Sequence, residues 1–282
     1  MIRPKLFLDT NVCIDVASGR ICPAEWRRVQ KYINAHYRYY ISWITWKELL
    51  TKLSRGSDDY FQRNKEPLRV LYGPAKRHFL PYPFVFAIRT TLGIKVARNY
   101  NSNLTEEEVL EAVLKATIDA PNKTALRNGI RSRSQRKFTR FDLDDFDTHE
   151  NAPQKESAEL LQGIREGTID KPERRKWAAW ILHPWGLTPY TDKCEKLADA
   201  LDAAYRFTLS LSKLARDKGY DFNTHASNWG DTLQLFYLCD ESMHFLTQDA
   251  DFRNRTTNSP QSCRILTYGE FVRSAAESQR RP

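Results

Sequence analysis

The stretch that decides the fold is KLFLDTNV, residues 5–12. A short apolar run ends at Asp9, and the polar residues Thr10 and Asn11 follow before the chain becomes apolar again at Val12. This pattern is typical of a buried parallel strand whose carboxyl end opens into a crevice, where ligands bind in open α/β sheets. Because a buried carboxylate is costly unless it is paired or binds a metal, we expect other residues to join Asp9.

The composition of the chain is that of a folded, basic protein. It has 282 residues, of which 41% are hydrophobic, and this excludes a disordered chain. Lys and Arg number 44 against 35 Asp and Glu, and the formal net charge of +9 favours a polyanionic partner such as nucleic acid. A soluble protein can also be basic without such a partner.

The five cysteines are scattered and form no C-x-x-C pair, so neither a zinc site nor a disulfide framework is expected. A reducing cytoplasm is therefore the predicted location. The sequence shows no signal peptide and no apolar run of membrane-spanning length, and we expect no membrane partner.

Strands and helices alternate only near the two ends of the chain. Residues 1–56 and 221–282 together predict one α/β core, with a central parallel sheet flanked by helices. Residues 57–220 lack this alternation and predict a large, mostly helical insertion that could form a subdomain for a substrate or a partner. Its longest helix is expected over 192–218. Strands are expected at 5–8, 39–41, 243–247 and 264–267.

Acidic residues stand where four segments are expected to reach one edge of the sheet. Asp249 and Asp251 follow the third expected strand as Asp9 follows the first. Glu48 lies in the first turn of a helix, which a Thr-x-x-Glu capping box at Thr45 is expected to open. Asp231 begins another helix. In a parallel α/β sheet the helix after a strand starts at the same edge, so these acids could meet.

Clustered carboxylates repel one another and lose hydration, and they persist when a hard divalent cation neutralises them. Ligands that are all oxygen atoms select magnesium or manganese. With one or two such ions, the natural chemistry is hydrolysis of a phosphodiester bond.

Each acid also has a purely structural alternative. Asp9 could cap the helix that follows it, and Glu48 could be only the N3 member of the capping box. Asp231 could be a favourable charge in the first turn of a helix, and Asp249 or Asp251 could shape a turn. Four such coincidences at one edge are less expected than a site.

Four segments resemble the motifs of the PIN-domain superfamily, small metal-dependent ribonucleases that include many toxins of bacterial toxin–antitoxin pairs. Residues 8–12, LDTNV, resemble its opening motif, and residues 41–49, ISWITWKEL, resemble the segment whose glutamate is a metal ligand. Asp231 with the apolar residues 233–238 resembles the third acid, and residues 246–252, LTQDADF, resemble the fourth segment. The resemblance covers the two ends of the chain and leaves out the insertion, which exceeds the family's usual connection.

This resemblance implies a PIN-like fold and an endoribonuclease that uses Mg²⁺ or Mn²⁺. It implies that the metal ligands and catalytic acids are Asp9, Glu48, Asp231 and Asp249. By the same analogy Asp251 could add a ligand or only fix the turn, while Asn11 and Thr247 would orient ligands or water from behind.

A basic run without acids lies in the predicted insertion and is followed by an acidic run over 141–150. The two runs could be a solvated loop whose halves neutralise each other, or a phosphate-binding arm masked by acids. The nucleic-acid contacts predicted on the second interpretation are Lys123, Arg127, Arg131, Arg133, Arg136, Lys137 and Arg140. Three tryptophans could stack bases or simply pack in the core: Trp177, Trp180 and Trp185.

The leading hypothesis is a metal-dependent endoribonuclease whose insertion selects RNA. It could act as a toxin or in defence, with a cognate inhibitor protein or a second copy of the chain as further partners. The alternatives are a nuclease that acts on DNA, and a non-catalytic PIN-like module that binds RNA or a protein. A phosphatase with an aspartyl-phosphate is disfavoured because Asn11 stands where its general acid is needed.

Overall fold

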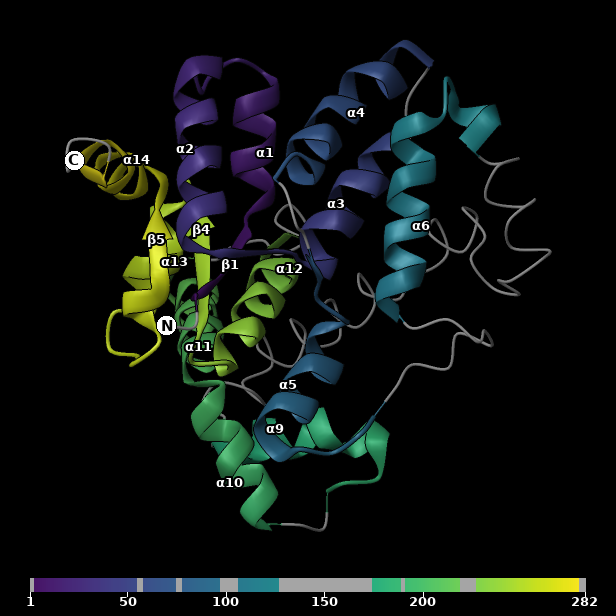
Figure 1. The fold of residues 1–282 in the computed structure, drawn as a ribbon. Coiled ribbons are helices and arrows are strands. Elements are labelled where there is room, and N and C mark those ends of the chain that lie inside the picture. Colours follow the sequence, from purple (N-terminus) through teal and green to yellow (C-terminus); the bar gives the residue numbers. More distant parts are fainter. Residues whose placement is uncertain are drawn as a thin grey trace.

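The computed structural model describes residues 3–54, 58–74, 78–96, 106–126, 174–188, 191–218 and 227–278. These residues form an all-parallel, five-stranded sheet flanked by helices, in the strand order β3-β2-β1-β4-β5 (Figure 1). The expected α/β architecture with a central parallel sheet is therefore confirmed. The strands are β1 Lys5–Leu8, β2 Arg38–Ile41, β3 His78–Phe79, β4 Met243–Thr247 and β5 Ile265–Thr267.

The helices of the sheet-forming ends are α1 Thr10–Ala17, α2 Pro23–His36, α3 Trp43–Ser54, α12 Ser227–Gln234, α13 Ala250–Arg255 and α14 Tyr268–Ser278. The helices between them are α4 Asp58–Tyr72, α5 Pro83–Leu92, α6 Glu106–Asp119, α9 Arg174–Leu182, α10 Thr191–Ala200 and α11 Asp202–Lys218. The chain also contains three short described 3₁₀ helices, which are η1 His183–Trp185, η2 Leu235–Cys239 and η3 Ser262–Arg264.

Strand β1 lies in the middle of the sheet, with β2 on one side and β4 on the other. Phe7 is in register with Tyr40 of β2 and with Phe245 of β4. Leu6, Phe7 and Leu8 are completely buried, as expected for a central strand that is covered on both faces. This burial explains the uninterrupted apolar run before Asp9.

Aromatic side chains attach helices to the two faces of the sheet. On one face, the Phe7 ring stacks on Phe245 at 4.7 Å and meets Tyr237 of η2 edge-on at 5.4 Å. On the other face, His244 contacts Tyr37, and Tyr37 contacts Phe271 of α14 at 5.6 Å. Because neighbouring residues of a strand point to opposite faces, η2 and α14 lie on opposite sides of the sheet.

The sheet extends into the segment that the sequence assigned to the insertion. Strand β3, at residues 78–79, pairs in parallel with β2, so residues 57–220 contribute its edge strand. The sequence predicts no strand within residues 57–220, and that prediction is wrong for these two residues. The pairing is short, since Pro81 and Pro83 follow at once and lack the backbone N–H that a ladder needs.

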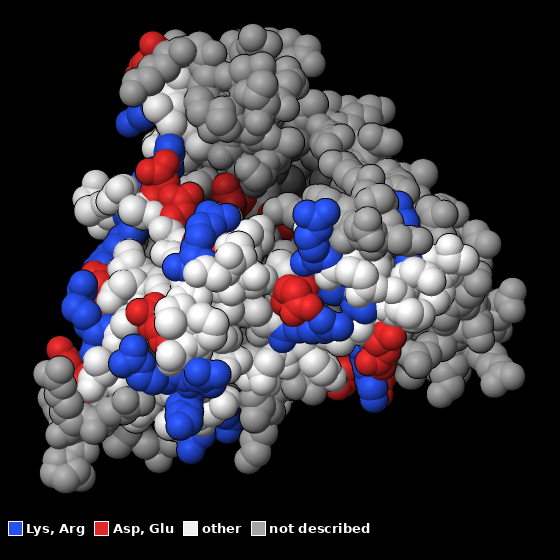
Figure 2. All heavy atoms as spheres, turned by 90° about the horizontal axis from the view of Figure 1, so that it is seen from above, with Lys and Arg blue, Asp and Glu red and all other residues white. Residues whose placement is uncertain are grey.

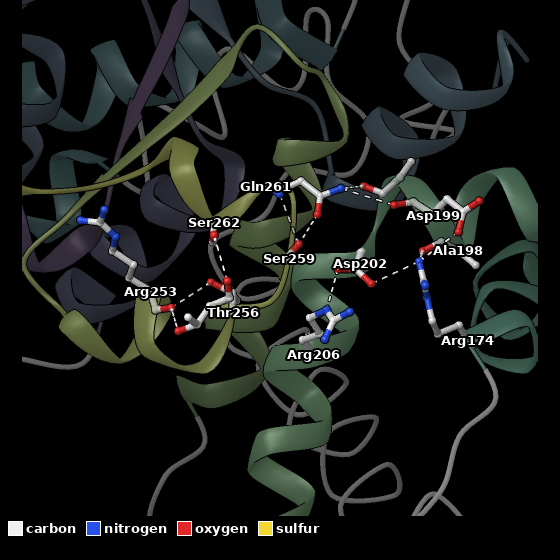
Figure 3. Close-up of polar contacts among 12 residues, drawn as sticks. Arg174, Ala198, Asp199, Asp202, Arg206, Arg253, Thr256, Ser259, Gln261 and Ser262 are labelled. Carbon is white, nitrogen blue, oxygen red and sulfur yellow. Dashed lines mark hydrogen bonds and ion pairs between the residues drawn. The ribbon is translucent and has the colours of Figure 1, made fainter.

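The helix expected over 192–218 is in fact two helices, α10 and α11, with a break at Leu201. The Gln261 side chain donates hydrogen bonds to the carbonyls of Asp199 at 3.3 Å and Ala200 at 3.4 Å (Figure 3). Beyond the break, buried Asp202 begins α11 and pairs with Arg206 at 2.7 Å. A glutamine about sixty positions away in sequence thus supplies hydrogen bonds to carbonyls at the break.

Candidate functional site

Asp9 stands directly after β1 and is only 3% exposed. It occupies the position before the first residue of α1, yet its carboxylate makes no capping hydrogen bond. Thr247, the last residue of β4, instead donates its hydroxyl to Asp9 Oδ2 at 2.8 Å, and Gln234 Nε2 lies 3.5 Å from Oδ1. The structural alternative of a simple helix cap therefore does not account for Asp9.

The charge of Asp9 is strongly disfavoured in the folded protein. Burial is the main cause, and the nearby carboxylates of Glu48 and Asp249 add to it. The hydrogen bond from Thr247 opposes the shift only in part, so the pKa of Asp9 is raised to about 7. A cation beside Asp9 would stabilise the charged carboxylate and so offset the effects of burial and of the neighbouring acids on its pKa.

Glu48 projects from α3, and the helix begins earlier than the sequence indicated. The prediction that a capping box at Thr45 opens this helix is wrong, because α3 starts at Trp43 and Ser42 Oγ accepts the Thr45 N–H at 3.0 Å. The Thr45 hydroxyl donates to the Leu8 carbonyl at 2.8 Å, which ties α3 to the end of β1. Glu48 is therefore not the N3 member of a capping box, and its Oε2 accepts a hydrogen bond from the Thr10 hydroxyl.

Asp231 lies half-buried in α12 and completes a group of interacting acids. Burial raises its pKa well above the usual value, and the charges of Glu48, Asp9 and Asp249 raise it further. The guanidinium of Arg255 acts in the opposite direction. Four segments that are distant in sequence thus bring carboxylates into one another's electrostatic field, as the sequence predicted for one edge of the sheet.

The acids after β4 have different surroundings. Asp249 caps α13, because its Oδ1 accepts the Asp251 N–H at 2.8 Å, and its own N–H donates to Thr247 Oγ1 at 2.9 Å. The turn-shaping alternative therefore holds for Asp249 alongside its place in the acid group. Asp251 is exposed and pairs with Arg255 at 2.6 Å, so its carboxylate is directed to an arginine.

The structure places the remaining predicted residues in different surroundings. Asn11 is exposed in the first turn of α1. Lys123 is partly buried just after α6. Trp177 is buried in the core, whereas Trp180 is 42% exposed and meets the Phe84 ring edge-on. The other predicted nucleic-acid contacts, between positions 127 and 140, lie outside the described residues, as does the acidic run over 141–150.

Sequence reasoning missed two residues that hold the acids in place. Gln234 lies one helical turn after Asp231, and besides approaching Asp9 it accepts the Ser42 hydroxyl at 3.1 Å and donates to Thr45 Oγ1 at 3.2 Å. Thr10 supports Glu48. A polar glutamine between the apolar neighbours of η2 and α12 was the only available signal for Gln234, while nothing in the local sequence pointed Thr10 toward α3.

The donor chemistry of the four acids fits a hard divalent cation. All of their donor atoms are carboxylate oxygens, the ligands that Mg²⁺ and Mn²⁺ prefer. Within the described part of the chain, no three His, Cys, Asp or Glu side chains already stand in a metal-binding arrangement. Binding would therefore require the carboxylates to turn, in a group whose mutual repulsion a cation would remove.

A Thr247→Val variant is expected to bind Mn²⁺ about 10- to 100-fold more weakly than wild type. Valine keeps the shape of threonine but removes the hydroxyl that joins Asp9 Oδ2 to the Asp249 N–H. Isothermal titration calorimetry with Mn²⁺ measures the effect. The matched control is Thr267→Val at the end of β5, where the hydroxyl bonds Glu270 at 2.9 Å, and it should leave the affinity unchanged. Equal affinities for both variants would contradict this role of Thr247.

Comparisons of the chain with protein-family models, with curated proteins and with solved structures give no match. Among the described helices, none combines the length and apolar character needed to span a membrane. The functional argument therefore rests on the site and its electrostatics.

Proposed function

We propose that the chain is a metal-dependent endoribonuclease that hydrolyses phosphodiester bonds of RNA. The observation that carries the proposal is the mutual electrostatic influence of Asp9, Glu48, Asp231 and Asp249, which come from four segments and include one carboxylate buried at the end of the central strand. The all-parallel sheet is compatible with the PIN-like fold that the sequence motifs resemble. Both features support the same chemistry.

In this proposal the four acids would hold Mg²⁺ or Mn²⁺. The bound ion supplies an activated water and neutralises charge on the scissile phosphate. Thr247 and Gln234 keep Asp9 oriented from within the core. Thr10 does the same for Glu48, so side chains outside the acid group hold these two carboxylates near the place from which they would turn to the metal.

The charge of the chain supports a polyanionic substrate. Its formal net charge is +9, although the acid group itself is negative. Figure 2 shows Lys and Arg side chains in several groups over one face of the molecule, with Asp and Glu between them. We propose that the segment 57–220 serves substrate selection, since it supplies both β3 at the sheet and the basic run.

Wild-type protein is expected to cut RNA internally when Mn²⁺ or Mg²⁺ is present and to stop when EDTA is added. The test uses end-labelled RNA and DNA oligonucleotides of one sequence, each single- and double-stranded, resolved on denaturing gels. If only the DNA oligonucleotides are cut, the substrate is DNA and the proposal of an RNA substrate is wrong. Tight RNA binding without any metal-dependent cleavage would contradict the nuclease and favour a binding module.

A further inference from the structure

Gly230 lies inside α12, directly before Asp231, where glycine is an unfavourable residue. Inside a helix, glycine costs about 1 kcal/mol relative to alanine. The backbone does not demand glycine here, because the described glycines with positive φ are Gly19, Gly93 and Gly186. The reason for this glycine must then be the space that it leaves empty.

That space is occupied by the carboxylate of Glu48. A Cβ at position 230 would lie 2.7 Å from Glu48 Oε1, far inside the distance at which a carbon and an oxygen touch. The other neighbour is the Ile44 side chain, at an ordinary van der Waals distance of 3.6 Å. The close approach therefore concerns one carboxylate and not the surrounding core.

The same carboxylate is held from its other side. Thr10, at the start of α1, donates its hydroxyl to Glu48 Oε2, while Oε1 faces Gly230. Glu48 thus reaches from α3 into a gap between α1 and α12. Any side chain on α12 at this position would move the carboxylate out of the gap, because the end of a glutamate is more easily displaced than two packed helices.

We propose that Gly230 is a positioning residue of the metal site: its missing side chain admits the Glu48 carboxylate beside Asp231, so that both can bind one cation. This inference rests on the function proposed above. It assigns to Gly230 a role in metal affinity and none in the chemistry itself, which distinguishes it from the four acids.

The test compares Gly230→Ala with Gly269→Ala. Gly269 is also helical, in α14, but a Cβ there meets nothing within 4 Å. Both changes replace a helical glycine by alanine, a better helix former, so in EDTA neither variant should melt below the wild-type temperature. Titration calorimetry should show Mn²⁺ binding 10- to 100-fold weaker for Gly230→Ala and unchanged for Gly269→Ala.

A double-mutant cycle adds a readout that a merely structural role would not move. Glu48→Asp shortens the side chain by one methylene and withdraws the carboxylate from position 230. Its cost in Mn²⁺ affinity should be smaller in the Gly230→Ala background than in the wild-type or Gly269→Ala background. An equal cost in all three backgrounds would overturn the proposal.

The remaining outcomes separate this inference from the proposed function. Wild type that binds no Mn²⁺ would overturn the metal site, and this inference with it. Wild type and Gly230→Ala that bind Mn²⁺ equally would overturn only the role of Gly230. Should Gly230→Ala fail to fold, adding Glu48→Ala removes the colliding carboxylate, so restored folding supports the proposal and continued unfolding overturns it.

Discussion

An Asp9→Asn variant is expected to lose metal-dependent RNA cleavage by on the order of 10³-fold while it keeps the wild-type fold. Asparagine has nearly the same shape, and its one acceptor oxygen can keep the hydrogen bond from Thr247, although its NH2 group then faces the amide nitrogen of Gln234. What disappears is the negative charge closest to the centre of the sheet. Initial rates on one RNA at saturating Mn²⁺ give the ratio, and circular dichroism checks the fold.

The matched control is Asp15→Asn, which removes the same charge from α1, the helix that directly follows Asp9. Asp15 pairs with Arg20 at 2.9 Å, so its carboxylate already has a partner outside the acid group. Its cleavage rate should stay within about twofold of wild type, because an ion pair near the surface contributes little. Full activity in Asp9→Asn, or an equal loss in both variants, would show that the acid group is not the metal site.

The sheet and the position of its acids could be predicted because they depend on local pattern and on one general rule. KLFL and MHFLT are short apolar strands that end in polar residues, and parallel strands present their carboxyl ends at one edge. Asp9 and Thr247, separated by 238 positions, consequently form a hydrogen bond. No property of the insertion was needed for that prediction.

Other features could not be predicted because they are set by partners that are distant in sequence. The break between α10 and α11 involves Gln261, and the Thr45 hydroxyl bonds the carbonyl of Leu8. Such contacts override local propensity without leaving a local signal. The strand β3 was missed because of its local sequence. It has only two residues, and the prolines near it indicate irregular structure.

Without metal, the protein is expected to lose stability as the pH rises from about 4 to about 7, and Asp9 contributes to this loss together with Asp231, whose pKa is also raised. The pKa of Asp9 is about 7 in the folded state but near 3.8 in the unfolded chain, so between these values the folded state holds a proton that the unfolded state has released. Unfolding then becomes easier with rising pH. By this linkage, Asp9 alone accounts for on the order of 4 kcal/mol, fully expressed above pH 7.

Urea unfolding of wild type and Asp9→Asn in EDTA, followed by tryptophan fluorescence between pH 4 and 8, isolates this contribution. The difference in unfolding free energy should grow with pH in favour of the variant, and Mn²⁺ should reverse it, because the metal binds the deprotonated acid. Asp240→Asn provides a control whose cost in unfolding free energy should stay constant between pH 4 and 8, because the pKa of Asp240 lies below this range. Burial raises the pKa of Asp240, but hydrogen bonds from Lys5 and Ser242 outweigh it and lower that pKa, so its stabilisation is present at neutral pH and is lost in acid. A pH-independent difference for Asp9→Asn would mean that Asp9 is not buried among charges as the structure has it.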